Sequence, residues 1–198
     1  MFPSHDPWGS GDLYIYGAQL EQGSSPSPYI PTTSSTRNRV KDTIHKDLVE
    51  FGFNQNELTV LCEFESAGST GSDFPWAFCI SDGSGDYRYG TYGYVAGSNK
   101  TFVFNINSDE GAAINANYES NYTPYSTIRA MFGFKGNDNA VSDDGDTVVT
   151  NSRAIPENVN LLNVASENSF SQQLNGHVKK LIIWPKRLAN ATLEAESV

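Results

Sequence analysis

The 198-residue chain has two cysteines, Cys62 and Cys79, which excludes a framework of several disulfides. A single bridge remains open if two strands place the pair face to face. Because both cysteines lie within apolar stretches, buried free thiols are the favoured prediction. No apolar run approaches the ~20 residues that cross a bilayer, and the opening MFPSHDPWGSGD lacks the basic and apolar regions of a signal peptide. We therefore expect a soluble chain with no membrane partner.

Positive charge is also scarce. Lysine and arginine number 13 against 23 acidic residues, which gives a formal charge of −10. Binding to phosphates needs clustered Lys and Arg, so we predict no nucleic-acid partner, while neutral ligands and cations remain open. The three histidines, His5, His45 and His177, lie in no metal-ligand spacing and indicate no Ser-His-Asp arrangement.

Helical patterns are nearly absent, and short strand patterns take their place. The chain is long enough for one domain with a sizeable core, and its 17 glycines supply many turns. From residue 41 onward, strand-like stretches recur about every ten to fifteen residues with turn signals between them, a spacing typical of sandwiches and jelly rolls. These stretches are ELTVLCEFES, PWAFCISDG, DYRYGTYGYVAG, KTFVFNINSD, AAINANYES, TIRAMFGFKGN, DTVVTNSRA and NVNLLNVASE.

The last thirty residues carry two further predictions. In HVKKLIIWPKRL the continuous apolar run Leu181 to Trp184 predicts a central strand covered on both faces, paired with early strands of the domain. The stretch LANATLEAES predicts a short helix capped by Asn190.

The N-terminal residues 1–40 differ from residues 41–198, which we predict to form the main domain. DLYIYGAQLEQG favours a strand near residues 13–18, and the stretch that follows contains Pro26, Pro28 and Pro31, as expected for an extended linker. A lone strand cannot bury a core of its own. It either adds to the main domain or closes a module that lies upstream.

Three stretches carry a resemblance to known families. LNGHVKKLIIWPKRLANATLEA resembles the terminal strand and helix of concanavalin A-like, laminin-G-like jelly-roll domains, and TIRAMFGFKGNDNAVSDDGDTV resembles the preceding hairpin of that family. LYIYGAQLEQGSSPSPYIPTTSSTRNRVKD is similar to a segment of bacteriophage tail-fibre and other virion proteins that leads into such a domain. The resemblance implies an all-β, concanavalin A-like jelly-roll sandwich of two antiparallel sheets with a short C-terminal helix. It also implies a location on the virion, at a phage tail or capsid surface.

The middle of the chain has the residues that a sugar-binding site needs. Neutral sugars stack their C–H faces on aromatic rings and exchange hydrogen bonds with short polar side chains. The candidates are Trp76, Tyr87, Arg88, Tyr89, Tyr92, Tyr94, Asn105 and Asn107. Tyrosines are equally ordinary in half-buried sheets, so packing is the competing interpretation for each of them.

Two acidic loops offer the hard oxygen ligands that calcium prefers. Laminin-G-like relatives often hold calcium at a loop edge, and this resemblance supports the same prediction here. Asp-Gly is also a common hairpin turn, so plain turns are the alternative. The candidate ligands are Asp82, Asp86, Asp143, Asp144 and Asp146.

Jelly rolls of this type also include glycoside hydrolases and alginate lyases, so the fold does not decide the function. Glu63 and Glu65 share one strand face, as a retaining glycosidase requires. Family 16 glycoside hydrolases use the pattern E-x-D-x-x-E, and this stretch lacks its Asp and its third acid. We therefore predict a non-catalytic carbohydrate-binding, receptor-recognition module whose partner is an oligosaccharide or polysaccharide on a host surface. The alternatives are a structural or homo-oligomerisation domain and, third, a polysaccharide-degrading enzyme.

Overall fold

The computed structural model describes Leu20, Pro31, Asp42 and residues 44–67, 74–84, 87–96, 99–107, 114–120, 122–169 and 172–198. The chain divides into two units, Met1–Lys41 and Asp42–Val198, and nearly all described residues belong to the second. The strand predicted at residues 13–18, and the predicted linker except Pro31, lie outside the described residues.

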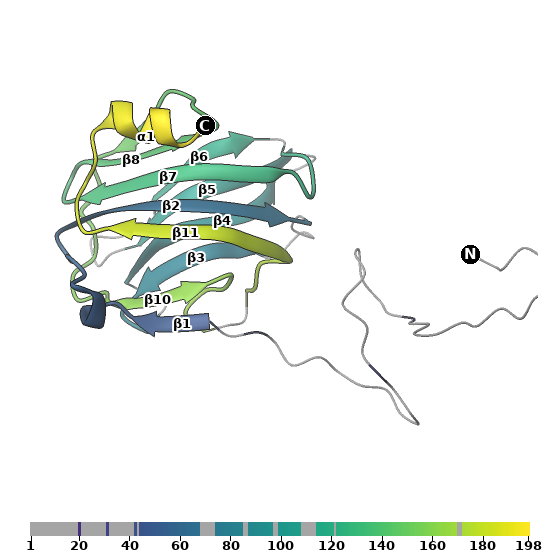
Figure 1. Ribbon diagram of the computed structural model, residues 1–198, viewed down its shortest axis with the longest axis horizontal. Helices are drawn as coiled ribbons and strands as arrows, with labels where there is room; N and C mark the ends of the chain where they lie inside the picture. The colour runs from purple at the N-terminus through teal and green to yellow at the C-terminus, as the bar shows by residue number, and fades with distance from the viewer. Residues whose placement is uncertain are drawn as a thin grey trace, which may run out of the picture. The chain divides into compact units, whose positions relative to one another are not determined.

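The second unit is a sandwich of two antiparallel sheets, one in front of the other in Figure 1. The six-stranded sheet has the order β1 (Ile44–Asp47), β10 (Leu161–Val164), β3 (Trp76–Ser81), β4 (Arg88–Ala96), β5 (Asn99–Asn107) and β6 (Ile114–Ser120). The five-stranded sheet has the order β11 (Gly176–Trp184), β2 (Glu57–Ser66), β7 (Thr127–Lys135), β8 (Asn139–Asp143) and β9 (Val149–Asn151). A 3-10 turn, η1 (Val49–Phe51), follows β1, and the chain closes with the helix α1 (Asn190–Glu196). The predicted all-β sandwich with a short C-terminal helix is confirmed.

Alternation along the strands builds the core between the two sheets. In β2, Val60 and Phe64 face the core, while Glu63 and Glu65 between and beyond them are partly exposed. Aromatic rings from the two sheets meet in the middle. Phe64 lies 4.8 Å from Phe102, measured between ring centroids, and the rings pack edge to face. Apolar area removed from water at this interface is the main source of the fold's stability.

Both cysteines are free and buried, as predicted. Burial raises the pKa of Cys62 far above its ordinary value and raises the pKa of Cys79 to about 12. Neither thiol is therefore a reactive thiolate at neutral pH.

The prediction for the last strand is half right. Leu181 and Ile183 pack against the main core, and Ile182 and Trp184 pack on the other side against a small apolar cluster that contains Leu193 of α1. Both faces of β11 are thus partly covered along the apolar run at its end. In the described sheet, however, β11 lies at the edge with β2 as its neighbour, so the predicted central position is wrong. This second apolar cluster, not a second flanking strand, accounts for the continuous apolar run.

The predicted helix is present, but its predicted cap is wrong. The N-cap residue is Ala189, which makes no side-chain cap hydrogen bond. Asn190 is instead the first helical residue, and its Oδ1 accepts a hydrogen bond from Arg187 Nη2 at 2.5 Å. Among the described residues, no helix is long and apolar enough to cross a membrane.

Candidate functional site

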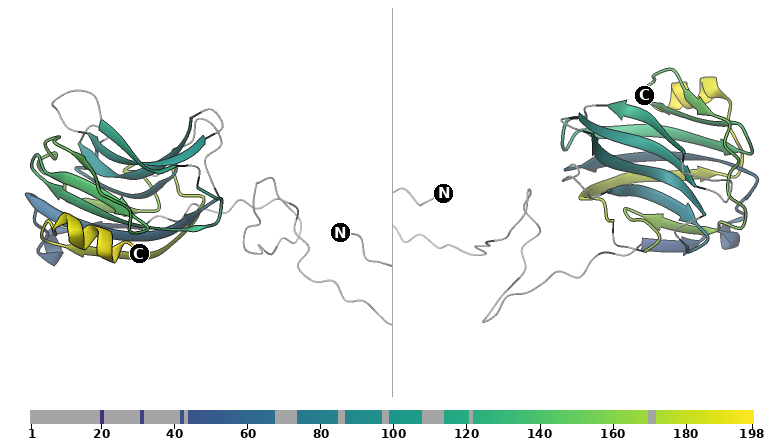
Figure 2. Two further views of the ribbon diagram at one scale, coloured as in Figure 1. Left: turned by 90° about the horizontal axis from the view of Figure 1, so that it is seen from above. Right: turned by 180° about the vertical axis from the view of Figure 1, so that it is seen from behind.

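The six-stranded sheet has an inner face against the core and an outer face away from it. Tyr89 belongs to the core cluster, so its neighbours Arg88 and Gly90 lie on the outer face. The register places Tyr92 opposite Trp76 in β3 and Val103 in β5. Seen from above, the sheet is curved and its outer face lies on the inside of the curve (Figure 2). A concave face of this kind suits an extended ligand.

Aromatic rings and one guanidinium form a continuous row on this outer face. The ring centroid of Phe74 lies 5.5 Å from that of Tyr92, and Tyr92 lies 4.9 Å from Trp76. The guanidinium carbon of Arg88 lies 4.9 Å from the centre of the Trp76 ring, a cation–π contact. The row therefore runs from Phe74, two residues before β3, to Arg88, the first residue of β4.

The residues after β10 fold over one end of this row. Trp76 Nε1 donates to Gln172 Oε1 at 3.1 Å, and Ala165 N donates to the Ala77 carbonyl at 2.9 Å. We call Ala165–Ser169 with Gln172–Leu174 the covering segment. It anchors on the sheet by these polar contacts and by Leu174 and Ala165, which pack with the main core.

Arg88 and the covering segment form an ion pair. Arg88 Nη1 lies 3.3 Å from Glu167 Oε2 and 3.4 Å from Asn168 Oδ1. The side chains of Arg88 and Glu167 are 22% and 9% exposed, so the pair is largely withdrawn from water. A charge pair in such surroundings is stronger than one on an open surface.

Three of the predicted sugar-binding residues are buried, which contradicts a direct role for them. Tyr89 is fully buried, and its ring lies 4.3 Å from that of Phe134 in the core. Trp76 is 1% exposed beneath Tyr92 and the covering segment, and Asn105 is 2% exposed. The sequence shows a Tyr-rich alternation but does not show which of its two faces meets the opposite sheet.

The other predicted residues fall into three groups. Tyr92, Arg88 and Asn107 lie on the outer face and are partly exposed, and the register pairs Asn107 with Arg88. Tyr87 is partly buried against the core, so packing is its role. The side chain of Tyr94 lies outside the described part of the structure.

Three outer-face residues that the sequence prediction missed complete the arrangement. Phe74 is 37% exposed and packs edge-on against Tyr92, and Asn168 and Gln172 are partly exposed on the covering segment. The aromatic-rich FPWAF gave a signal for Phe74, whereas nothing local placed residues 168 and 172 there. The candidate site is therefore Phe74, Arg88, Tyr92, Asn107, Asn168 and Gln172.

The described acidic residues of the two predicted calcium loops lie in or beside turns, with Asp143 at the end of β8. Asp82 Oδ1 accepts a hydrogen bond from Ser84 N at 2.7 Å, and Asp86 lies outside the described residues. In the second loop, Asp146 N donates to the Asp143 carbonyl at 2.8 Å. Asp144 has a left-handed backbone, and burial together with nearby Asp146 raises the pKa of its carboxyl group.

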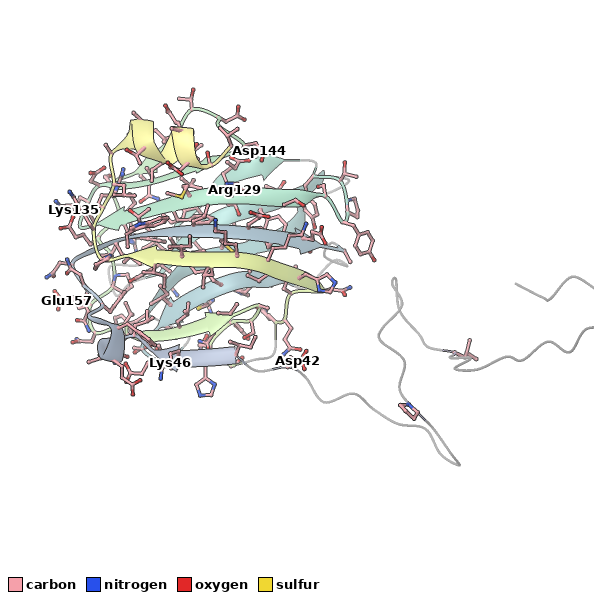
Figure 3. The ribbon with its side chains drawn as sticks, viewed as in Figure 1. Asp42, Lys46, Arg129, Lys135, Asp144 and Glu157 are labelled. Atoms are coloured by element: carbon pink, nitrogen blue, oxygen red, sulfur yellow. The ribbon has the colours of Figure 1, made fainter. Side chains whose placement is uncertain are left out.

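The second acidic loop is tied to α1, as Figure 3 illustrates for the labelled Asp144. Gly145 N donates to Ser197 Oγ at 3.1 Å, and Val148 N donates to a Glu194 carboxylate oxygen at 3.1 Å. Among the described residues, no group of three or more His, Cys, Asp or Glu side chains is placed to hold a metal ion. Calcium binding stays a prediction.

The paired carboxylates Glu63 and Glu65 lie on the outer face of the other sheet, and each has a cationic neighbour. Glu63 Oε2 lies 3.2 Å from Nη1 of Arg129, the residue labelled in Figure 3, and Glu65 Oε1 lies 2.5 Å from Lys179 Nζ. The hydrogen bond from Lys179 lowers the pKa of Glu65 below its ordinary value. A general acid needs the opposite shift, so this pair is poorly suited to glycoside hydrolysis.

No protein-family model matches the sequence, and no curated protein is significantly similar to it. Solved structures nevertheless share its architecture. The CBM40 domain of the Ruminococcus gnavus IT-sialidase superposes with a TM-score of 0.61 at 9% identity, over 80% of this chain and 95% of that chain. The chain has a concanavalin A-like jelly-roll fold.

Two further structures share this jelly roll. The heptameric SAP-like pentraxin from Limulus polyphemus matches with a TM-score of 0.56 at 11% identity, over 72% of this chain and 70% of that chain. The LG4-5 domains of the mouse laminin α1 chain match with a TM-score of 0.52 at 16% identity, over 76% of this chain and 41% of that chain. At these identities the likeness concerns the fold alone.

Proposed function

We propose that this jelly roll is a non-catalytic carbohydrate-binding module that recognises a glycan at the candidate site. The supporting observation is the row of contacts from Phe74 through Tyr92 and Trp76 to Arg88, exposed in part at both ends. Phe74 and Tyr92 supply ring surface for sugar C–H groups, and Arg88, Asn107, Asn168 and Gln172 supply polar groups for hydroxyls. The buried Trp76 holds the row in place. Its indole is packed and hydrogen-bonded, so it orients Tyr92 without touching the ligand.

One of the structures that share this fold has been solved with bound oligosaccharides. The R. gnavus IT-sialidase CBM40 has been solved bound to α2,3- and α2,6-sialyllactose. That fact concerns the R. gnavus domain, and it makes a glycan the first ligand class to test here.

The test is a glycan array with the full chain, comparing the unmodified protein with Tyr92→Ala and Phe74→Ala. We expect each substitution to weaken binding by about fivefold or more, since an aromatic contact is worth ~1 kcal/mol beyond its buried area. Tyr125→Ala is the matched control, because Tyr125 is 50% exposed and is not a residue of the candidate site. Equal binding by all four proteins would refute the assigned site, and a chelator arm tests the predicted calcium.

We further propose that the module serves a phage-type structural protein at the virion surface, where it recognises a host glycan. The similarity of LYIYGAQLEQGSSPSPYIPTTSSTRNRVKD to tail-fibre segments supports this context. Repetition of the module on a virion would raise a weak single-site affinity through avidity. Binding of the chain to intact host cells, competed by the glycan that the array identifies, is the direct measurement.

A structural role through homo-oligomerisation is the second candidate. Ile44, Val49 and Phe51 are 57%, 60% and 67% exposed on β1 and η1, at the edge of the six-stranded sheet. Exposed apolar groups on an edge strand favour association with a second copy. Analytical ultracentrifugation tests this role. If the chain associates with itself, its apparent mass should rise with protein concentration, and Phe51→Ala should lower that mass.

A further inference from the structure

Arg88 is the one cationic member of the candidate site, and its charge is already matched within the protein. Glu167 Oε2 lies 3.3 Å from Arg88 Nη1, and the Trp76 ring covers one side of the guanidinium. A free arginine in this place would attract a sugar carboxylate strongly. The ion pair removes that attraction.

Glu167 is held firmly in its position. The hydroxyl of Ser169 donates to Oε1 of Glu167, so each carboxylate oxygen has a partner. The Glu167 side chain is 9% exposed, which means that separation from Arg88 would leave a nearly buried carboxylate without its counter-charge. Displacement of Glu167 by a ligand anion is therefore unfavourable.

We propose that Glu167 is a specificity-determining residue that makes the candidate site select uncharged glycans over glycans bearing a carboxylate. The inference rests on the proposed function and narrows it to a ligand class. A sugar hydroxyl can accept from Arg88 without displacing Glu167. A sugar carboxylate must approach Glu167 itself, and like charges in a partly buried site repel strongly.

The net charge of the chain acts in the same direction. With a formal charge of −10, the protein repels anionic ligands at long range, and dissolved salt screens this contribution. The repulsion of an anionic ligand by Glu167 acts at short range, and the Glu167 side chain is nearly buried, so salt reduces this repulsion much less. Raising the salt concentration therefore separates the two contributions.

The experiment uses matched pairs of oligosaccharides that differ at C6 alone, a neutral hexose oligomer and the corresponding hexuronic acid oligomer. Binding is measured for the unmodified chain and for Glu167→Gln. We expect the unmodified chain to prefer the neutral member, and we expect Glu167→Gln to reduce that preference by about tenfold, the scale of a charge-pair contribution to selectivity. Glu63→Gln is the matched control. It removes the same charge from an ion pair on the outer face of the other sheet, and it should leave the preference unchanged.

Ser169→Ala provides a second route if Glu167→Gln fails to fold. It removes the hydroxyl that holds Oε1 and leaves the charge in place, so a smaller fall in the preference is expected. Equal binding of both members by the unmodified chain overturns the inference and leaves the proposed function standing. If folded Glu167→Gln prefers the neutral oligosaccharide as strongly as the unmodified chain does, the inference is likewise overturned and the proposed function still stands. Absence of binding to every neutral and acidic glycan overturns both.

Discussion

The charged side chains on the two outer faces of the sandwich find their ion-pair partners in different ways. On the five-stranded sheet, neighbouring strands supply both signs of charge, with Glu63 paired to Arg129 and Glu65 to Lys179. On the six-stranded sheet, Arg88 takes its partner from the covering segment, and the aromatic row beside it stays partly exposed. A face that pairs its own charges offers little to a ligand. The six-stranded face keeps ring surface and polar groups available.

The elements that cover the two outer faces also differ: α1 covers part of the five-stranded sheet, and the covering segment covers part of the six-stranded sheet. Helix α1 inserts the fully buried Leu193 into an apolar cluster with Leu61 and Met131, so its cover is a small core of its own. Beneath and beside the covering segment, Arg88 Nε, the Asn163 side-chain amide and Ser166 Oγ are buried without a hydrogen-bond partner in the described part of the chain. Buried polar atoms without partners cost free energy. The covering segment is therefore the weaker cover of the two.

The largest expected effect comes from the tryptophans on the two outer faces. Trp76→Ala should lower the free energy of unfolding by about 4 kcal/mol, because the ring is fully packed and its loss leaves a cavity. Trp184→Ala should cost about 2 kcal/mol, since Trp184 is partly exposed beside α1. Urea unfolding followed by far-UV circular dichroism measures both. Equal costs would show that the two covers are equally well packed.

A pair of glycines, one in each sheet, compares how closely the backbone is approached. A Cβ on Gly90 would lie 2.2 Å from the Phe78 carbonyl oxygen, whereas one on Gly133 would meet the end of the Arg187 side chain at 2.7 Å. A backbone atom cannot move aside as a side chain can. We expect Gly90→Ala to cost about 3 kcal/mol and Gly133→Ala about 1 kcal/mol in the same unfolding experiment. The reverse order would mean that the close approach of β3 and β4 is easily relaxed.

The smallest expected effect concerns the ion pairs of the five-stranded face. The hydrogen bond from Lys179 lowers the pKa of Glu65, so the folded state favours the carboxylate. This stabilisation is present above the unfolded pKa of about 4.3 and is lost as the pH falls through the lower folded pKa. The Tm of the unmodified chain should therefore exceed that of Glu65→Gln at neutral pH, and the difference should shrink on acidification.

The partner variant sharpens this last test. When Lys179 is replaced by Met, Glu65→Gln should no longer lower the Tm more at neutral pH than at acidic pH. A difference that persists there would assign the effect to another neighbour of Glu65, such as Thr127, whose hydroxyl lies 3.5 Å from Glu65 Oε1.

Local alternation predicted the strands well and the site less well. ELTVLCEFES coincides with β2, because successive side chains point alternately to the core and to the outer face of the sheet. In the Tyr-rich stretch, Tyr89 faces the core whereas Arg88 and Tyr92 lie on the outer face, and the alternation did not show which set faces the other sheet. The short strand β1 escaped prediction because all four of its residues are exposed and carry no alternating apolar pattern.

The all-β sandwich, the two buried free thiols and the short final helix could all be predicted from the amino-acid sequence. Those properties follow from side-chain periodicity, turn residues and cysteine surroundings, which are local. The tertiary structure alone decided that β11 lies at a sheet edge, that Trp76 and Tyr89 are buried, and that Glu167 meets Arg88. Arg88 and Glu167 are 79 residues apart in the chain. Contacts at such separations depend on strand order and on the path of the loops, and no short stretch of sequence specifies either.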